Sequence, residues 1–366
     1  MATRNKEDVD DFHTIVAGSE EYNDDDFTPD ESSFFWADMG EAFGASGYEW
    51  KRLHEEFTAS ENHLWGADGI TPNDVKQGGL GNCWVLSAAS AIAEKPGRIE
   101  KIFLNESSTL NDAGVYAVNL YSLGVPHTVV VDDWLPIKNG QTLFSKVSKD
   151  GAMWMAILEK AFAKYHGNYM HIAGGDPLQS VKTISGAPGK YIGHANTTVE
   201  DLWTALSEHD GSDDTIQAGT AGGTSDQYTN DDGLYNSHAY TTLGVVTLSD
   251  GTRLVRMRNP HGKDTFRGRW SDDSELWTEE FKAEAGFTHD KDDGRIFMQL
   301  EDYHAQVSTT FINYDTTNWG YDYFLKLNDT SSSPGQWSWC GAECTRHVVT
   351  LTSEVDQQVH ISGHVW

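Results

Sequence analysis

Residues 77–84 read QGGLGNCW, and residues 85–93 continue as the small, apolar run VLSAASAIA. Three glycines within residues 78–81 allow a tight or closely packed backbone path that a β-carbon would obstruct. The run behind them favours a buried helix, which Pro96-Gly97 would end. The pattern predicts a loop that delivers Cys83 to the first turn of that helix, where free N–H groups and the helix dipole stabilise a thiolate. The alternative is a small buried cysteine that only packs.

Size and composition indicate a globular protein with about two domains. The chain has 366 residues, of which 38% are hydrophobic and 13 are Trp, too many for a disordered protein. Its net charge of −30 argues against a nucleic-acid partner, because phosphates would be repelled at long range.

Cysteine usage and hydropathy predict a cytoplasmic protein. The three cysteines, Cys83, Cys340 and Cys344, are too few for a disulfide framework. Cys340 and Cys344 are predicted to be unrelated thiols rather than half of a zinc site, because structural zinc needs four ligands. The N-terminus lacks the apolar stretch of a signal peptide, and no run is long enough to span a membrane.

Periodicity places a second helix and several strands along the chain. Residues 153–165 carry apolar side chains at helical spacing, which predicts a helix with a core-facing side. The predicted strands are 115–120 and 128–132 joined by a turn at Gly124, 239–246 and 253–258 joined by Asp250-Gly251, and 295–300. Residues 211–233 are rich in Gly, Ser, Thr and Asp, which predicts an exposed flexible loop.

One set of residues satisfies the needs of cysteine catalysis. A thiolate requires a histidine to carry its proton, a group that orients this histidine, and donors for the oxyanion. His238 opens one predicted strand and Asn259 closes the next, so a hairpin would bring them side by side. Either residue taken alone is more often structural, and only their joint placement suggests a site.

Three blocks, QGGLGNCWVLSAASAI, SHAYTTLGV and RMRNPHG, resemble the catalytic blocks of the calpain-type cysteine proteases, which share papain-like chemistry. The likeness extends from about residue 27 to 310 and includes FTPDESSFFW, VVVDDWLPIKNGQTLF and MWMAILEKAFAKYHGNY. It implies Cys83 as nucleophile, His238 as general base and then acid, and Asn259 as the group that holds the imidazole. Gln77 would donate its side-chain amide to the oxyanion, beside the backbone N–H of Cys83.

One departure lies close to these residues. Where family members commonly carry Trp, this chain has His261, two residues after Asn259. We expect His261 to take over a packing role there.

The resemblance also implies two calcium sites, since calcium binds several carboxylate and carbonyl oxygens. The first would use the backbone carbonyls of Ala67 and Gly69 and the carboxylate of Asp74. Its remaining carboxylate falls on Met170, which does not ligate a hard ion.

The second implied calcium site retains Asp272 and Asp293, but Thr265 and Arg295 replace two of its acids. An arginine there would repel the ion. The predicted cysteine chemistry itself requires no cofactor. Both calcium ligand sets are incomplete, which argues against activation by calcium.

The resemblance predicts an α+β, papain-like core of two subdomains that face each other across a cleft. An acidic flexible segment (1–29) would precede the core (30–308), whose subdomains are about 30–190 and 200–308. A partial β-sandwich (309–366) would follow. The expected function is intracellular cleavage of proteins or peptides through a Cys-His-Asn triad and an acyl-enzyme. The alternative is an inactive calpain-like module that binds a partner or senses calcium. The sequence identifies no regulatory subunit.

Overall fold

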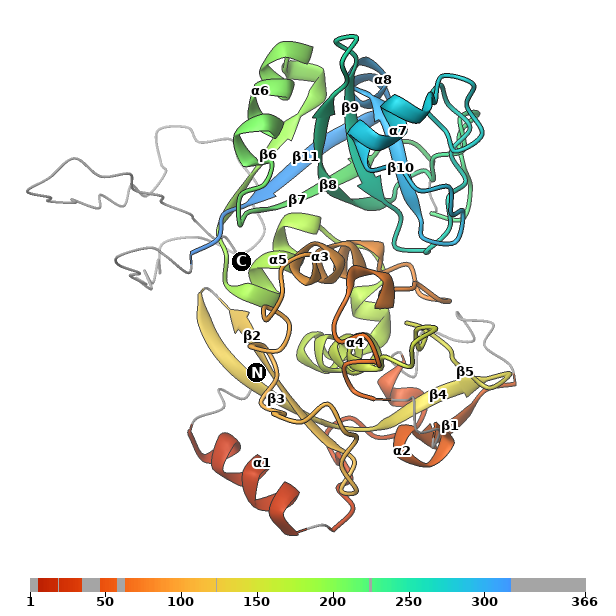
Figure 1. Ribbon diagram of the computed structural model, residues 1–366. Helices are drawn as coiled ribbons and strands as arrows, with labels where there is room; N and C mark the ends of the chain where they lie inside the picture. Colours follow the sequence, from red (N-terminus) through yellow and green to blue (C-terminus); the bar gives the residue numbers. More distant parts are fainter. Residues whose placement is uncertain are drawn as a thin grey trace, which may run out of the picture. The chain divides into compact units, whose positions relative to one another are not determined.

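The computed structural model describes residues 6–18, 20–34, 47–57, 63–122, 124–223 and 226–316 (Figure 1). In these ranges helices and antiparallel sheets pack around two large hydrophobic cores. The α+β class predicted from the sequence is confirmed. Residues 317–366, with Cys340, Cys344 and nearly all of the predicted C-terminal module, lie outside the described residues.

The first core is centred on two helices, α3 (Cys83–Ala93) and α4 (Trp154–His166). All of α3 is buried, because its side chains are apolar or small and can be packed on every side. The long hairpin of β2 (Val115–Ser122) and β3 (Val125–Asp132) supplies further apolar residues to this core. The other elements of this region are η1 (Glu31–Ser33), β1 (Glu49–Arg52), α2 (Leu53–Glu56), η2 (Pro72–Asp74), β4 (Trp134–Lys138), β5 (Gln141–Thr142), η3 (Tyr169–Ile172) and α5 (Pro177–Ser185).

The second core lies on an antiparallel sheet of six strands in the order β10-β9-β8-β7-β11-β6. The apolar residues of α6 (Val199–His209) and α8 (Leu300–Gln306) pack into it. The strands are β6 (Gly189–Gly193), β7 (Thr215–Thr220), β8 (Ala239–Thr247), β9 (Arg253–Arg258), β10 (Arg295–Gln299) and β11 (Val307–Asn313). The short helices η4 (His194–Asn196) and α7 (Glu279–Ala285) complete this region.

Helix α3 lies between the six-stranded sheet and α4, so it belongs to both halves of the fold (Figure 1). Several of its contacts with the sheet are polar. The Gln217 side-chain amide shares a hydrogen bond with the Ser87 hydroxyl (2.7 Å), and the Thr241 hydroxyl donates to the Ser87 carbonyl (2.8 Å). Arg258 Nη1 donates to the Ser90 hydroxyl (3.4 Å). Because such bonds are directional, they fix how α3 lies against the sheet.

Most predicted elements are found, with one clear error. The helix at 153–165 and the hairpins at 115–132 and 239–258 are confirmed, and every predicted end lies within three residues of the observed one. The predicted flexible loop at 211–233 is wrong in part, because β7 (Thr215–Thr220) lies inside it as an interior strand of the sheet. This strand has one large apolar residue, Ile216, and the buried Gln217 is satisfied by Ser87, so its sequence resembles a loop.

Two segments near the chain ends add contacts that the sequence does not predict. The N-terminal segment contains α1 (Lys6–Gly18), whose Phe12 is buried among residues of β2 and β3. The buried Asp24 carboxylate pairs with Lys164 Nζ of α4 at 2.6 Å. Strand β11 crosses residue 309, the predicted start of the C-terminal module, and pairs with β6 and β7. In the described ranges, no helix combines the length and apolar character needed to cross a membrane.

Candidate active site

Cys83 is the first residue of α3, as predicted, and follows a loop that packs tightly against the chain. Gly78 is required in that loop, since a β-carbon would lie 1.8 Å from the carbonyl oxygen of Phe144. Asn82 does not cap the helix; its Nδ2 donates to the buried Glu159 carboxylate (2.7 Å). Cys83 itself is 7% exposed. Packing therefore fixes the thiol at the helix start.

His238 and Asn259 meet at one end of the β8–β9 hairpin. His238 directly precedes β8, Asn259 directly follows β9, and both side chains are buried. His238 Nε2 lies 3.0 Å from Asn259 Oδ1, which also accepts a bond from the His261 N–H (3.0 Å). An amide oxygen only accepts, so Nε2 carries the proton and Nδ1 is left for chemistry.

An aspartate that the sequence analysis does not name completes the group. Sγ of Cys83, a ring nitrogen of His238 and a carboxylate oxygen of Asp226 all lie within 4.8 Å of one another. Asp226 Oδ2 is 3.8 Å from His238 Nδ1. Asp226 belongs to the connection between β7 and β8, the same stretch that the sequence predicts to be a flexible loop.

Gln77 joins this group through its side-chain amide. Its Nε2 donates to the Leu80 carbonyl (2.8 Å) and to Asp226 Oδ2 (3.0 Å), so both amide protons are used. The backbone N–H of Gln77 donates to the Pro260 carbonyl (2.8 Å), which ties this loop to the end of β9. The residue predicted to bind an oxyanion therefore holds a carboxylate oxygen in this structure.

The local charges favour a protonated histidine. Burial alone would lower the pKa of His238, but the Asp226 carboxylate, the Cys83 sulfur and Asn259 together raise it to about 9. Burial would raise the pKa of Asp226, yet contacts with His238 and Gln77 hold it below its usual value. At neutral pH the group therefore contains an imidazolium next to a carboxylate.

Comparison with known proteins identifies the chain at this point. The sequence pattern described as "Calpain family cysteine protease" matches residues 22–313. This chain belongs to the calpain family. A "Calpain-type cysteine protease ADL1" from Oryza sativa subsp. japonica is 30% identical over 310 residues, which cover 81% of this chain and 14% of the rice protein. Calpain-12 of Mus musculus is 32% identical over 276 residues, covering 73% of this chain and 37% of the mouse protein. The matched part thus spans well under half of either relative.

His261 packs on His238 in this calpain-family protein, at the position where the family resemblance implies a Trp. The two rings stack with centroids 4.6 Å apart and planes 29° apart, and Tyr235 contacts His261 edge-on. Burial and the charge of His238 lower the pKa of His261 to about 4, so it is neutral at pH 7. A neutral flat ring can cover the His238–Asn259 hydrogen bond from solvent.

The first implied calcium site fits an ion poorly. Asp74 is buried, and its carboxylate already accepts bonds from the Thr71 N–H (2.8 Å), the Thr71 hydroxyl (2.9 Å) and Trp154 Nε1 (2.8 Å). Burial is the main cause that raises its pKa to about 6. An ion held by the backbone carbonyls of Ala67 and Gly69 would have to displace these donors from the Asp74 carboxylate.

At the second implied calcium site, the Asp272 carboxylate is less occupied by hydrogen bonds than the Asp74 carboxylate is. Asp272 Oδ2 is buried without a hydrogen bond in the described residues. Burial, together with the nearby charge of Asp293, raises the pKa of Asp272. Burial and the charges of Asp272 and Asp293 raise the pKa of Asp264 to about 7. Arg295 Nε, however, lies 3.8 Å from Asp293 Oδ2, which supplies part of the positive charge that an ion would bring. The calcium ligands remain a prediction at both sites.

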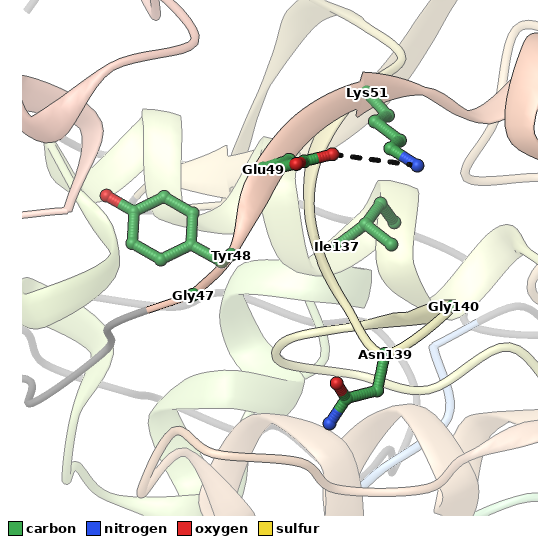
Figure 2. Close-up of a pocket in the computed structure, with 7 residues that line it drawn as sticks. All are labelled: Gly47, Tyr48, Glu49, Lys51, Ile137, Asn139 and Gly140. Atoms are coloured by element: carbon green, nitrogen blue, oxygen red, sulfur yellow. Dashed lines mark ion pairs between the residues drawn. The ribbon is translucent and has the colours of Figure 1, made fainter.

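A separate pocket of about 270 Å³ opens beside β1 and β4 (Figure 2). Figure 2 shows Glu49 and Lys51 on its wall, joined by an ion pair of 3.8 Å. Its lining residues are Gly47, Tyr48, Glu49, Lys51, Ile137, Asn139 and Gly140. None of them belongs to the group around Cys83.

Proposed function

We propose that this protein is a cysteine endopeptidase that cleaves peptide bonds in other proteins by limited proteolysis. One observation carries the proposal: in a chain of the calpain family, the Cys83 sulfur lies within 4.8 Å of a His238 ring whose Nε2 is held by Asn259. A thiol at a helix start, a histidine and an orienting amide are the minimum set for an activated cysteine nucleophile.

The chemistry begins with attack of the Cys83 thiolate on the carbonyl carbon of the substrate. The oxyanion that forms accepts hydrogen bonds from Gln77 Nε2 and the Cys83 backbone N–H. His238 gives its proton to the leaving amine as the C–N bond breaks, which leaves an acyl-enzyme. Neutral His238 then takes a proton from water, the hydroxide attacks the thioester carbonyl, and the acid product and thiolate are released. Asn259 acts by positioning the imidazole.

Asp226 has to leave Gln77 during this cycle. Its Oδ2 accepts the Gln77 amide proton that the oxyanion needs. Placing the oxyanion and the Asp226 carboxylate together at this donor would bring two negative charges into contact, which is unfavourable. A bound substrate would displace the carboxylate, and His238 would lose a stabilising charge at the same moment. Substrate binding would thereby make His238 a better acid for the leaving group.

Replacement of Cys83 tests the proposal directly. We expect Cys83→Ala to abolish hydrolysis of a denatured protein substrate and labelling by a peptide epoxide, while the circular dichroism spectrum stays unchanged. Cys340→Ser with Cys344→Ser is the matched control, and this double variant should be labelled as the parent is, with the adduct at residue 83. Turnover retained in Cys83→Ala would refute the proposal.

The same labelling with and without a calcium chelator separates the alternatives. An inactive module that only binds partners or senses calcium would not be labelled in either condition. Labelling that needs calcium would favour the predicted ligands Asp272 and Asp293, and labelling in chelator would place activity outside calcium control. Acyl transfer to an added amine in place of water uses the same residues and would appear as an amide product. The expected substrates are proteins or peptides, and a cytoplasmic location remains a prediction from the small number of cysteines.

A further inference from the structure

The three atoms that converge at the candidate active site have the composition of a metal site. They are a thiol sulfur, an imidazole nitrogen and a carboxylate oxygen, from Cys83, His238 and Asp226, all within 4.8 Å of one another. His238 Nδ1 and Asp226 Oδ2 are 3.8 Å apart. Ligands bound to one tetrahedral zinc ion at ordinary bond lengths lie about 3.3–3.6 Å apart. Small side-chain movements would bring the three donors to that spacing.

Neighbouring hydrogen bonds hold His238 and Asp226 in place and leave His238 Nδ1 without a hydrogen bond in the described residues. His238 is 2% exposed, and its Nδ1 makes no hydrogen bond within the described part of the chain. Its other nitrogen is fixed by Asn259, and Asp226 Oδ2 is oriented by Gln77 Nε2. Metal-binding histidines and carboxylates in proteins are held by outer hydrogen bonds of this kind.

We propose that Cys83, His238 and Asp226 bind a thiophilic divalent cation of the zinc type, and that this ion reversibly inhibits the protein. A thiolate and an imidazole select zinc over calcium or magnesium, which prefer oxygen ligands. Three protein ligands leave a fourth position for water. The inhibition rests on the proposed function, because the ion would release the His238 Nδ1 proton to solvent and occupy the lone pairs of both the nucleophile and the base.

Asp226 is the residue that completes the set of three ligands. Cys83 and His238 alone offer two ligands, which hold zinc weakly, and Asp226 adds a third that is negatively charged. We expect its removal to weaken binding at least about tenfold, the lower end of what the loss of even an outer-shell partner costs. Asp231 lies five residues away on the same connection with an exposed side chain, and offers a control of equal charge.

Titration with Co²⁺ followed by absorption spectroscopy tests the site without relying on activity. The protein is the full chain with Cys340→Ser and Cys344→Ser, so that Cys83 is the only thiol. We expect one equivalent of Co²⁺ to give a thiolate-to-metal charge-transfer band and tetrahedral visible bands, both removed by Zn²⁺. Asp231→Ala should bind Co²⁺ as the parent does, Asp226→Ala at least tenfold more weakly, and Cys83→Ser without the charge-transfer band.

The outcomes separate this proposal from the proposed function. Absence of 1:1 binding, or equal affinity in Asp226→Ala and the parent, would overturn the metal site whatever the peptidase activity. Binding of Co²⁺ as expected in a protein that neither cleaves substrate nor reacts with the epoxide would uphold the site and overturn the proposed function. Where the protein is active, the Zn²⁺ concentration for half inhibition should rise at least tenfold in Asp226→Ala, and an unchanged value would contradict the inhibitory role.

Discussion

The helix that carries Cys83 and the hairpin that carries His238 are held by different forces. Helix α3 is buried along its whole length, and packing fixes its first residue. His238 and Asn259 are held by hydrogen bonds at strand ends, and a charged residue from a long connection reaches them. The position of the Cys83 thiol is therefore fixed by packing, whereas the orientation and protonation of the His238 imidazole depend on Asn259 and on the charge of Asp226.

The two regions also differ in the sign of their buried charge. Beneath α3, burial raises the pKa of Glu159 to about 7, although Asn82 and the Ser145 N–H donate to its carboxylate. At the hairpin, the pKa of His238 is raised to about 9 because Asp226 and Cys83 outweigh burial. The contribution of Glu159 to the free energy of unfolding should therefore change with pH below 7, and that of His238 should change above pH 6.5.

Gln77→Ala should give the largest effect, and the effect should be one of rate alone. Loss of one oxyanion donor typically costs about 10²- to 10³-fold in turnover. The alkaline limb of the pH–rate profile should stay near pH 9, since Asp226 and His238 remain. Measurement of kcat/KM from pH 5 to 10 checks both points. A loss smaller than tenfold would mean that Gln77 does not bind the oxyanion.

Glu159→Gln should alter stability with pH in the helix region. An acid whose pKa is raised on folding binds its proton more tightly in the native state, so stability falls as pH rises from 4.5 towards 7 and is then level. A rise from 4.5 to about 7 corresponds to on the order of 3 kcal/mol across that window. The difference in Tm between parent and variant, measured from pH 4.5 to 8, should follow this curve. Parallel Tm profiles would show that Glu159 ionises normally.

Asp226→Asn should change both rate and charge at the hairpin. Replacement of a charge-assisted bond to Gln77 by a neutral one frees the oxyanion donor, which should raise kcat/KM about tenfold near pH 7. The same change removes the carboxylate that raises the pKa of His238. The proton-donating imidazolium is then lost at lower pH, so the alkaline limb should move down from about 9.

Stability gives an independent measure of the same charge. His238 has a raised pKa, so its stabilisation is complete below pH 6.5 and is lost as pH rises to about 9. Asp226→Asn should flatten the Tm profile in this window, and Asp231→Asn should leave it unchanged. A variant with lower kcat/KM and an unmoved alkaline limb would show that Asp226 supports catalysis rather than holding Gln77.

The helix region is predictable from the sequence because its signals are local. Glycine spacing, small apolar residues and helical periodicity predicted α3 with Cys83 at its start, and α4 behind it. The β8–β9 hairpin was predictable for the same reason, because its turn at Asp250-Gly251 and its alternating residues lie within one stretch. That hairpin was enough to place His238 beside Asn259.

Asp226 and Glu159 were missed because their roles depend on tertiary contacts. Asp226 is one acid in a stretch without apolar anchors, and only the pairing of β7 with β8 and β11 brings its connection to Gln77. Glu159 lies on the buried side of α4, where its partner Asn82 is 77 positions away. The one available signal was a charged residue at a core position of a helix, which demands a buried partner.

His261→Ala should give the smallest effect, and it tests whether the hairpin needs cover as well as charge. An aromatic pair contributes about 0.5–1.5 kcal/mol beyond its buried area, which corresponds to roughly 2- to 10-fold in kcat/KM. Loss of the ring would admit water to the His238–Asn259 bond and lower the fraction of correctly oriented imidazole. His261→Trp, which introduces the residue that the family resemblance implies at this position, should restore activity to the level of the parent. Activity that is restored by Trp but not by Leu would assign the effect to a flat ring over His238, whereas equal activity in all three variants would leave the base region dependent on hydrogen bonds and charge alone.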